Sequence, residues 1–271
     1  MTRAELPVET PAENPAETFA QPGGGFVYIV GAGPGPVDLM TLRALDRLRR
    51  AEVVVHDRLI TPEVLAQIPE AAQRIYVGKA LGYHSVPQEG IHALLVEHAR
   101  RGRRVVRFKG GDPYVFGRGG EEVQALQAAG IAFEVVPGVT AASGCSAAAG
   151  IPLTHRDLAA SCVFLPGHLA DDAASHDWAA LARAGQTRVF YMGVQRLAQI
   201  ARQLIAHGLA PDTPAAIVRD GTRASQTVLA TGLSELVALA PGYGPQPGLL
   251  IIGETVQLSP DFRPSRIPYA S

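Results

Sequence analysis

Residues 26–57, FVYIVGAGPGPVDLMTLRALDRLRRAEVVVHD, decide the fold class of this 271-residue chain. An apolar, β-rich run at residues 26–30 leads through a Gly/Pro loop into an amphipathic segment at residues 39–50. A second apolar run follows at residues 52–57. The order strand, loop, helix, strand is typical of a βαβ unit with two parallel strands.

The same alternation continues to the end of the chain. We predict further strands at residues 74–78, 103–110, 133–137, 161–167, 187–193, 214–221, 225–232 and 248–256, and helices at residues 89–101, 121–129, 140–149, 178–184, 197–207 and 234–239. Strands that alternate with helices favour a mostly parallel sheet covered on both faces.

A fresh set of strands begins after Pro137 and Gly138. We therefore expect two α/β domains, residues 26–137 and 138–258. Outside them we expect a disordered N-terminal tail, residues 1–25, and a C-terminal tail, residues 259–271.

Composition excludes several classes of protein. The formal net charge is −1, which provides no field that favours nucleic acid or an anionic membrane. The N-terminal segment has no apolar stretch typical of a signal peptide, and the longest uncharged run, residues 135–154, is broken by Pro and Gly. Cys145 and Cys162 lack the spacing of metal ligands. We expect a cytoplasmic protein with buried thiols and no metal, and no nucleic-acid or membrane partner.

The first Gly/Pro loop resembles the dinucleotide fingerprint GxGxxG but departs from it. Pro36 stands where the third glycine belongs, and Pro34 removes a backbone N–H from the phosphate-binding turn. A pyrophosphate is therefore disfavoured, whereas Gly33, Pro34 and Gly35 can press their backbone against a neutral or cationic ligand. A tight turn that requires glycine explains the loop equally well.

Side chains at the carboxyl ends of other strands are candidates for chemistry, because ligands of open α/β sheets bind there. Asp57 could hold a hydroxyl or transfer a proton, although a turn cap explains it as well. Lys79 could steady carboxylates or donate a proton, or be an ordinary surface lysine. Tyr191 and Met192 end another strand, where Met192 could contact a ligand or fill the core.

The segment 108–122, FKGGDPYVFGRGGEE, is rich in glycine around Asp112. Glu121 and Glu122 open the next helix, where acidic side chains complement the helix dipole. The dipole does not explain Arg118, whose guanidinium beside glycines suits an anionic group.

The segment 137–157, PGVTAASGCSAAAGIPLTHRD, places Thr140 and Ala141 at a helix start, where backbone N–H groups lack partners. Its small residues could equally allow close helix packing. Arg156 is the charged group to note beyond this helix.

Taken in order, these segments closely resemble the uroporphyrinogen-III C-methyltransferases, a branch of the tetrapyrrole methylase family. The matching stretches are VGAGPGPVDLMTLRAL, VVVHDRLI, YVGKALGYHSVPQEGI, VVRFKGGDPYVFGRGGEE, VVPGVTAASGCSAAAGIPLTHRD, VFYMG and VRDGT, between residues 27 and 256. GxGPG and GGDP alone would indicate only the broader family. One departure is His56, where tyrosine commonly precedes the aspartate.

The resemblance implies an α/β fold with the active site in the cleft between two domains, a homodimer, and S-adenosylmethionine as cofactor, with S-adenosylhomocysteine as its product. Cofactor binding is implied for Gly33, Pro34, Gly35, Gly110, Gly111, Asp112, Val115, Thr140, Ala141, Met192 and Gly221. Acid/base roles are implied for Asp57 and Lys79, and tetrapyrrole binding or proton removal for Arg118, Glu121, Arg156, Tyr191 and Met192.

The implied reaction is methylation of uroporphyrinogen III at ring carbons C2 and C7, giving precorrin-2 via precorrin-1 for sirohaem, cobalamin or haem d1 synthesis. The protein would chiefly align substrate and methyl donor. Arg118, supported by Glu121, would remove a ring-nitrogen proton or only anchor a carboxylate. Length favours the stand-alone enzyme over a fused sirohaem synthase. The alternatives are a methylase of a later cobalamin precursor, a nucleotide-dependent oxidoreductase and a non-catalytic tetrapyrrole carrier.

Overall fold

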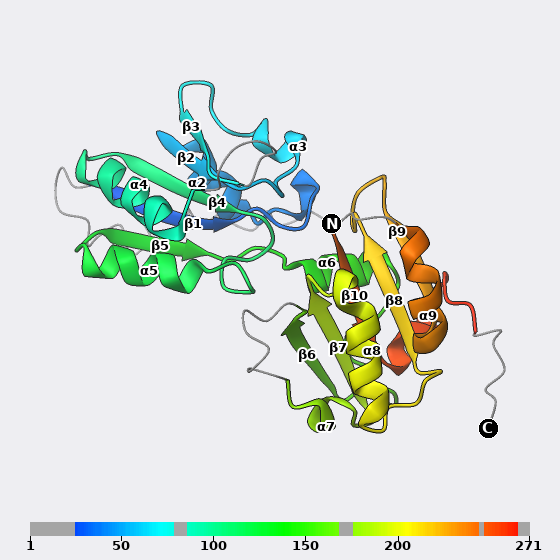
Figure 1. Cartoon of the computed structure of the whole chain (residues 1–271). Coiled ribbons are helices and arrows are strands. Elements are labelled where there is room, and N and C mark those ends of the chain that lie inside the picture. The colour runs from blue at the N-terminus through cyan, green and yellow to red at the C-terminus, as the bar shows by residue number, and fades with distance from the viewer. Residues whose placement is uncertain (1–24, 79–85, 168–175, 244–246, 265–271) are drawn as a thin grey trace, which may run out of the picture.

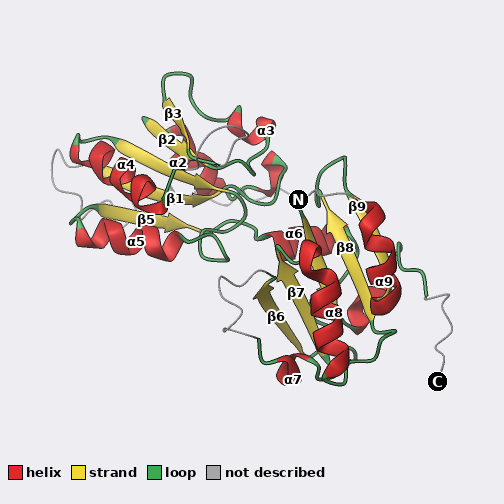
Figure 2. Cartoon of the chain, in the orientation of Figure 1, coloured by secondary structure: helices red, strands yellow, loops and turns green. Residues whose placement is uncertain are grey.

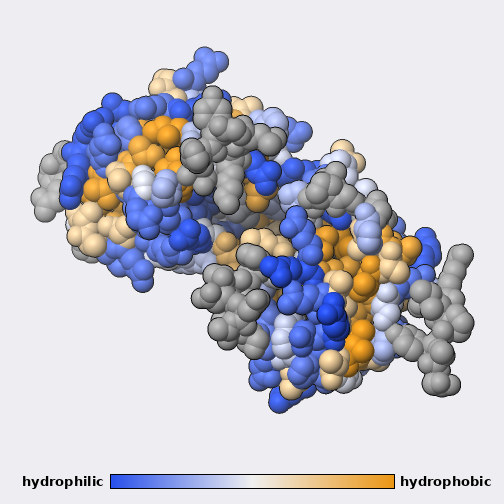
Figure 3. Space-filling view, in the orientation of Figure 1, coloured by the Kyte–Doolittle hydropathy of each residue, from blue (hydrophilic) through white to orange (hydrophobic). Residues whose placement is uncertain are grey.

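The computed structural model describes residues 25–78, 86–167, 176–243 and 247–264. It has two halves, each built on a five-stranded sheet (Figure 1). The face shown in the space-filling view has hydrophobic patches among polar residues on both halves, and the molecule narrows between the halves (Figure 3). The predicted N-terminal tail lies outside the described residues except for Gly25, and Lys79 lies outside them as well.

The first sheet is entirely parallel, with the strand order β3-β2-β4-β1-β5. Its strands are β1 (Phe26–Gly31), β2 (Val53–His56), β3 (Gln73–Tyr76), β4 (Arg104–Lys109) and β5 (Ala132–Val136). Central strands β1, β2 and β4 are buried on both faces. This burial explains the nearly continuous apolar sequences of β1 and β2, whereas β4 also carries Arg104, Arg107 and Lys109.

Helices cover both faces of this sheet (Figure 2). The helices are α2 (Leu42–Arg49), α3 (Pro62–Leu65), α4 (Gln88–Arg100) and α5 (Gly119–Ala128), with a short 3-10 turn, η1 (Val37–Leu39), before α2. Leu48 and Val64 pack on one face, while Leu95 and Leu126 pack on the other. The predicted helix 39–50 therefore starts late: the hydroxyl of Thr41 accepts the Ala44 N–H and caps α2 at its true beginning.

The second sheet has the order β6-β7-β10-β8-β9. Its strands are β6 (Ser161–Pro166), β7 (Gln186–Tyr191), β8 (Pro214–Arg219), β9 (Thr227–Gly232) and β10 (Gly248–Ile252). Only the β6–β7 pair is parallel, because β10 runs antiparallel to β7 and β8, and β9 runs antiparallel to β8. The prediction of a mostly parallel sheet is correct for the first half and wrong for the second, since apolar runs do not encode strand direction.

The second sheet is also covered on both faces. Its helices are α6 (Ala141–Ala148), α7 (Trp178–Leu181), α8 (Leu197–Ala206) and α9 (Leu233–Leu239), with 3-10 turns η2 (Val194–Arg196), η3 (Ala240–Tyr243) and η4 (Glu254–Leu258). Helices α7, α8 and α9 share one core, and α6 and η4 share the other. The predicted helix 178–184 ends at Leu181.

Residues 259–264, predicted as the start of a C-terminal tail, pack against the second half. The buried Ser259 donates its hydroxyl to Ala149 O at 2.7 Å, and Phe262 packs on the core beneath β9. None of the described helices is long and apolar enough to cross a membrane.

Two sheet edges face each other where the halves meet. In the first sheet, β1 and β4 are neighbouring strands. The chain runs from β1 to β2 on one side of this pair, and from β4 to β5 on the other side. The loops after β1 and β4 therefore flank the crevice in which parallel sheets bind ligands. In the second sheet β7 and β8 point the same way, because both are antiparallel to β10. Figure 1 shows these carboxyl edges directed at one another.

Candidate active site

The loops after β1 and β4 are joined into one rigid wall. Gly33 and Gly111 exchange two backbone hydrogen bonds, with N···O distances of 3.2 and 2.8 Å. Their φ angles of +75° and +69° are the left-handed conformation that glycine adopts without strain. The Thr61 hydroxyl donates to Gly35 O at 2.8 Å and holds the far end of the loop.

The second half packs against this wall through small residues. A Cβ on Gly111 would lie 3.8 Å from Ala141 N, and one on Gly144 would lie 2.6 Å from the Pro34 ring. A Cβ on Gly35 would lie 2.9 Å from the hydroxyl of Thr222. The structure thus brings together the Gly/Pro loop, the Gly-Gly-Asp turn and the start of α6, three segments to which the family resemblance assigns cofactor binding.

Asp112 organises the turn after β4. One carboxylate oxygen accepts the Tyr114 N–H at 2.8 Å, and the other accepts the Gly138 N–H at 3.1 Å. The carboxylate therefore links this turn to the junction between the two sheets and holds the backbone there.

Tyr191, at the end of β7, ties the second sheet to the start of α6. Its hydroxyl accepts the Ala142 N–H at 3.0 Å and lies 2.6 Å from the Thr140 hydroxyl. Its ring contacts Phe116 and Phe164, with centroid distances of 4.8 and 5.9 Å. Burial raises the pKa of Tyr191, so its phenol stays neutral at physiological pH.

Backbone strain gathers at the same place. Among the described residues, the non-glycine residues with positive φ are Phe116, Arg118, Met192, Asp220 and Thr222. All follow β4, β7 or β8 at the facing edges. The φ of +71° at the β-branched Thr222 is a particular outlier. Such strain is typical of functional sites, where the surrounding fold has to hold it in place.

Arg118 and Glu121 form an exposed pair at the start of α5. Arg118 Nε donates to both carboxylate oxygens of Glu121, at 2.9 and 3.1 Å. This hydrogen bond raises the pKa of Arg118 and lowers that of Glu121, so both groups stay charged. The guanidinium, with its side chain 57% exposed, is available to an anion but is a poor base.

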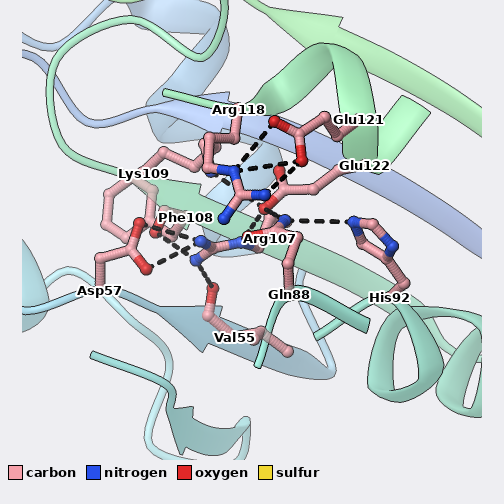
Figure 4. A network of polar contacts seen from close by, with 10 residues as sticks. All are labelled: Val55, Asp57, Gln88, His92, Arg107, Phe108, Lys109, Arg118, Glu121 and Glu122. Atoms are coloured by element: carbon pink, nitrogen blue, oxygen red, sulfur yellow. Dashed lines mark hydrogen bonds and ion pairs between the residues drawn. The ribbon is translucent and has the colours of Figure 1, made fainter. Parts of the chain in front are cut away.

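Asp57 lies at the end of β2 and is paired with Arg107 of β4. Arg107 Nη2 donates to both carboxylate oxygens, at 2.8 and 3.0 Å (Figure 4). Arg107 also binds the buried Glu122 of α5, whose same oxygen accepts the Lys109 ammonium at 3.0 Å. Desolvation by burial lowers the pKa of Lys109.

Arg107, Lys109 and Glu122 were not predicted as site residues, since Glu122 had been interpreted only as a helix-dipole residue. A signal was present, because Arg107 and Lys109 alternate with apolar residues at the end of β4, beyond the exposed Arg104 at its start. Such a strand requires buried counter-charges. Sequence spacing alone does not show that Asp57 and Glu122 supply them.

The remaining predicted residues differ in how closely they join the site. Gly221 packs against α6, since a Cβ there would lie 2.3 Å from Cys145 Sγ. Gly110 lies against Leu59, and Val115 is half-buried in the turn after β4. Arg156 is exposed in a separate turn and makes no hydrogen bond or ion pair with the other described site residues.

The two cysteines and His56 are buried to different extents. Cys145 is buried, whereas Cys162 is only half-buried, so the expectation of two buried thiols is correct for the first alone. His56 packs on Tyr76 at a centroid distance of 5.5 Å, and burial lowers its pKa.

A family model for tetrapyrrole (corrin/porphyrin) methylases matches residues 27–237. The chain belongs to the tetrapyrrole methylase family. Solved structures agree: uroporphyrin III C-methyltransferase from Thermus thermophilus is 42% identical, with a TM-score of 0.73 over 86% of this chain and 100% of that one. A cobalt precorrin-4 methyltransferase is 25% identical, with a TM-score of 0.75 over 85% of this chain and 95% of that one.

Curated relatives of this tetrapyrrole methylase include siroheme synthases. The protein from Edwardsiella ictaluri is 52% identical over 247 residues, and siroheme synthase 1 from Yersinia enterocolitica is 56% identical over 234 residues. These matches cover 91% and 86% of this chain but 53% and 49% of the relatives. The chain therefore spans about half the length of the curated relatives it matches.

The comparisons confirm the predicted family and the predicted α/β fold class. The Thermus protein was also solved in complex with S-adenyl homocysteine, at 42% identity and a TM-score of 0.73 over 86% of this chain and 100% of that one. This complex and the family assignment support S-adenosylmethionine as the cofactor of the tetrapyrrole methylase described here.

Proposed function

We propose that this chain transfers methyl groups from S-adenosylmethionine to C2 and C7 of uroporphyrinogen III, giving precorrin-2 via precorrin-1. The observation that carries the proposal is the meeting of Tyr191 and Thr140 with the bonded glycines Gly33 and Gly111 at the facing sheet edges. The higher identity to the Thermus enzyme, 42% against 25%, favours uroporphyrinogen III over a later cobalamin precursor.

The residues of the wall fit an adenosyl sulfonium better than a pyrophosphate. Gly33 and Gly111 use their N–H groups on each other, and Pro34 has none, so the loop offers few donors to phosphate. Met192, 60% exposed, presents an apolar thioether beside Tyr191. When bound, S-adenosylmethionine supplies an electrophilic methyl group. The residues that we assign to cofactor binding are Gly33, Pro34, Gly35, Gly110, Gly111, Asp112, Val115, Thr140, Ala141, Met192 and Gly221.

Arginine side chains would recognise the carboxylates of the tetrapyrrole. Arg118 is charged and exposed, and its raised pKa favours anchoring of a carboxylate over removal of a proton. Glu121 orients the guanidinium. Arg156 is the second candidate anchor, and Tyr191 together with Met192 would contact the macrocycle. We assign acid/base roles to Asp57 and to Lys79, as the family resemblance implies.

The proposal extends to the setting of the enzyme. We infer that its product feeds sirohaem synthesis, because the curated relatives carry that name. Cobalamin and haem d1 synthesis share the same first product and are the alternatives. We also propose a homodimer, which light scattering of the purified chain would test.

The cofactor assignment is tested by calorimetry with S-adenosylhomocysteine and with NAD. We expect micromolar or tighter binding of S-adenosylhomocysteine and no heat with NAD. Binding of NAD without binding of S-adenosylhomocysteine would contradict the methyltransferase assignment and favour an oxidoreductase.

The carboxylate anchor is tested by Arg118→Lys, which keeps the charge and removes the forked geometry. We expect the KM for uroporphyrinogen III to rise about tenfold, because a charge-assisted bidentate contact contributes roughly 1.5–3 kcal/mol. Arg101→Lys is the matched control: Arg101 pairs with Glu97 on α4, and its side chain is also 57% exposed. Undiminished turnover and an unchanged KM in Arg118→Lys would remove Arg118 from the mechanism.

A further inference from the structure

We propose that Arg107 is a positioning residue for Asp57, and that Glu122 in turn holds Arg107. The inference rests on the proposed function, because it concerns the residue to which that function assigns proton transfer. Both Arg107 and Glu122 are buried side chains.

The contacts of Arg107 leave its guanidinium a single orientation. Nε donates to Glu122 Oε1 at 2.8 Å, and Nη2 donates to the two oxygens of Asp57. Nη1 lies 3.3 Å from Val55 O and 3.4 Å from Phe108 O. These five contacts match the five N–H groups of an arginine. Rotation of the group would break several of them at once, so Asp57 is held by a fixed partner.

Burial decides how the cluster can act. The side chains of Arg107, Lys109 and Glu122 are 3%, 4% and 0% exposed, whereas that of Asp57 is 30% exposed. Only Asp57 can therefore reach a bound molecule. The three sealed side chains can influence the reaction only through Asp57 and through the backbone that carries them.

Glu122 is the centre of the cluster. One of its oxygens, Oε1, accepts from Arg107 and Lys109, and it also lies 3.4 Å from the Gln88 amide (Figure 4). Its other oxygen has no hydrogen-bond partner within the described part of the chain. One carboxylate oxygen thus fixes the positions of both cations relative to each other.

Stability alone is a weak explanation of this arrangement. Buried ion pairs often contribute no more to folding than apolar side chains of similar volume. The cluster also spans the parts of the site: Asp57 follows β2, Lys109 directly precedes the Gly-Gly-Asp turn, and Glu122 adjoins Glu121 on α5. It therefore fixes the proposed proton-transfer residue relative to the cofactor turn.

The same sheet provides a matched control. Arg47 Nε donates to Glu134 at 2.8 Å, and these side chains are 10% and 7% exposed. Glu134 pairs in register with Tyr28, whereas Arg107 pairs with Ile29, the next residue, so the two ion pairs lie on opposite faces of the sheet. Arg47→Met disturbs a buried ion pair of the same kind away from Asp57.

The test is a double-mutant cycle with Asp57→Asn, Arg107→Met and the double variant. The readouts are kcat, the KM for uroporphyrinogen III, and the Kd of S-adenosylhomocysteine. We expect each single variant to lower kcat by roughly 10- to 100-fold with KM and Kd changed less than about threefold, as for a misplaced reacting group. Because Arg107 acts through Asp57, the double variant should be no slower than Asp57→Asn alone.

A second variant keeps the test decisive if Arg107→Met fails to fold. Glu122→Gln keeps the size of the side chain but removes the negative charge that Arg107 and Lys109 share, and we expect it to lower kcat about tenfold in the same cycle. Arg47→Met should lower the melting temperature and leave kcat within about twofold of wild type.

Three results would overturn the inference: wild-type kcat in the folded variants of Arg107 and Glu122, multiplicative losses in the double variant, or an equal loss of kcat in Arg47→Met. Failure of the proposed function can be distinguished from failure of this inference. In that case the wild-type protein would bind its ligands but form no methylated product. That result would overturn both proposals, whereas an active wild type with insensitive variants overturns the positioning role alone.

Discussion

Replacement of Gly144 by alanine has two opposite effects on stability. Alanine favours the helix, but its methyl group would crowd the Gly/Pro loop at the proposed cofactor wall. Gly144 lies inside α6, where alanine is favoured over glycine by about 0.8–1 kcal/mol. Its Cβ, however, would lie 2.6 Å from Cγ and 2.9 Å from Cβ of Pro34, and 3.2 Å from Cγ2 of Thr222. The proline ring cannot rotate away, so α6 and the Gly/Pro loop must separate. Overpacking of this kind costs roughly 1–3 kcal/mol.

The balance predicts that Gly144→Ala is less stable by about 1 kcal/mol, which corresponds to a melting temperature about 2–4 °C lower. Because the displaced loop is the proposed cofactor wall, we also expect S-adenosylhomocysteine to bind about fivefold more weakly or worse. Thermal unfolding and calorimetry measure both quantities on the same protein.

Gly120→Ala is the matched control for the propensity term. A Cβ on Gly120, in α5, would have no neighbour within 4 Å, so we expect a gain of about 0.5–1 kcal/mol. If Gly144→Ala were stabilised like Gly120→Ala and bound S-adenosylhomocysteine normally, α6 would not press on the Gly/Pro loop and the reasoning about this wall would be refuted.

Two further predictions concern buried polar groups of α6. Tyr191→Phe leaves the Ala142 N–H without its acceptor, so we expect the free energy of unfolding, measured in urea, to fall by about 1–3 kcal/mol. The loss should be equal at pH 7 and pH 9, because the raised pKa of Tyr191 keeps its phenol neutral at both. A loss that differs between these pH values would contradict the neutral phenol. Burial raises the pKa of Cys145 to about 11. The buried neutral thiol therefore contributes its full stabilisation of the fold below pH 9, and this stabilisation is lost as the pH rises towards 11. Cys145 in the native protein should resist thiol reagents at pH 8, and rapid modification there would contradict its burial.

The alternation of strands and helices was readable from the sequence because local patterns encode it. The run at residues 26–30, its loop and the next strand all form where apolar periodicity and Gly/Pro placement indicate. The location of the candidate loops after β1 and β4 at one edge also followed, since parallel strands bring their carboxyl ends together; the bonding of Gly33 to Gly111 is a finding of the structure. These features depend on neighbours close in sequence or on a general rule of topology.

Features that depend on tertiary partners could not be predicted in the same way. Strand β10 runs antiparallel to β7 and β8. This direction depends on tertiary pairing, and the apolar sequence of β10 does not indicate it. Helix α3 has only a Thr-Pro start and one turn, too short for a periodic pattern. The cluster around Arg107 requires Asp57 and Glu122 to meet in space, and the positive φ of Thr222 contradicts the preference of its residue type.

The central claim is methyl transfer to uroporphyrinogen III, and mass spectrometry of the product tests it most directly. The purified chain would be incubated with enzymatically made uroporphyrinogen III and isotopically labelled S-adenosylmethionine. We predict a product with two labelled methyl groups and the release of two S-adenosylhomocysteines for each tetrapyrrole. Recovery of unmodified uroporphyrinogen III with no S-adenosylhomocysteine, from protein that binds both molecules, would contradict the account.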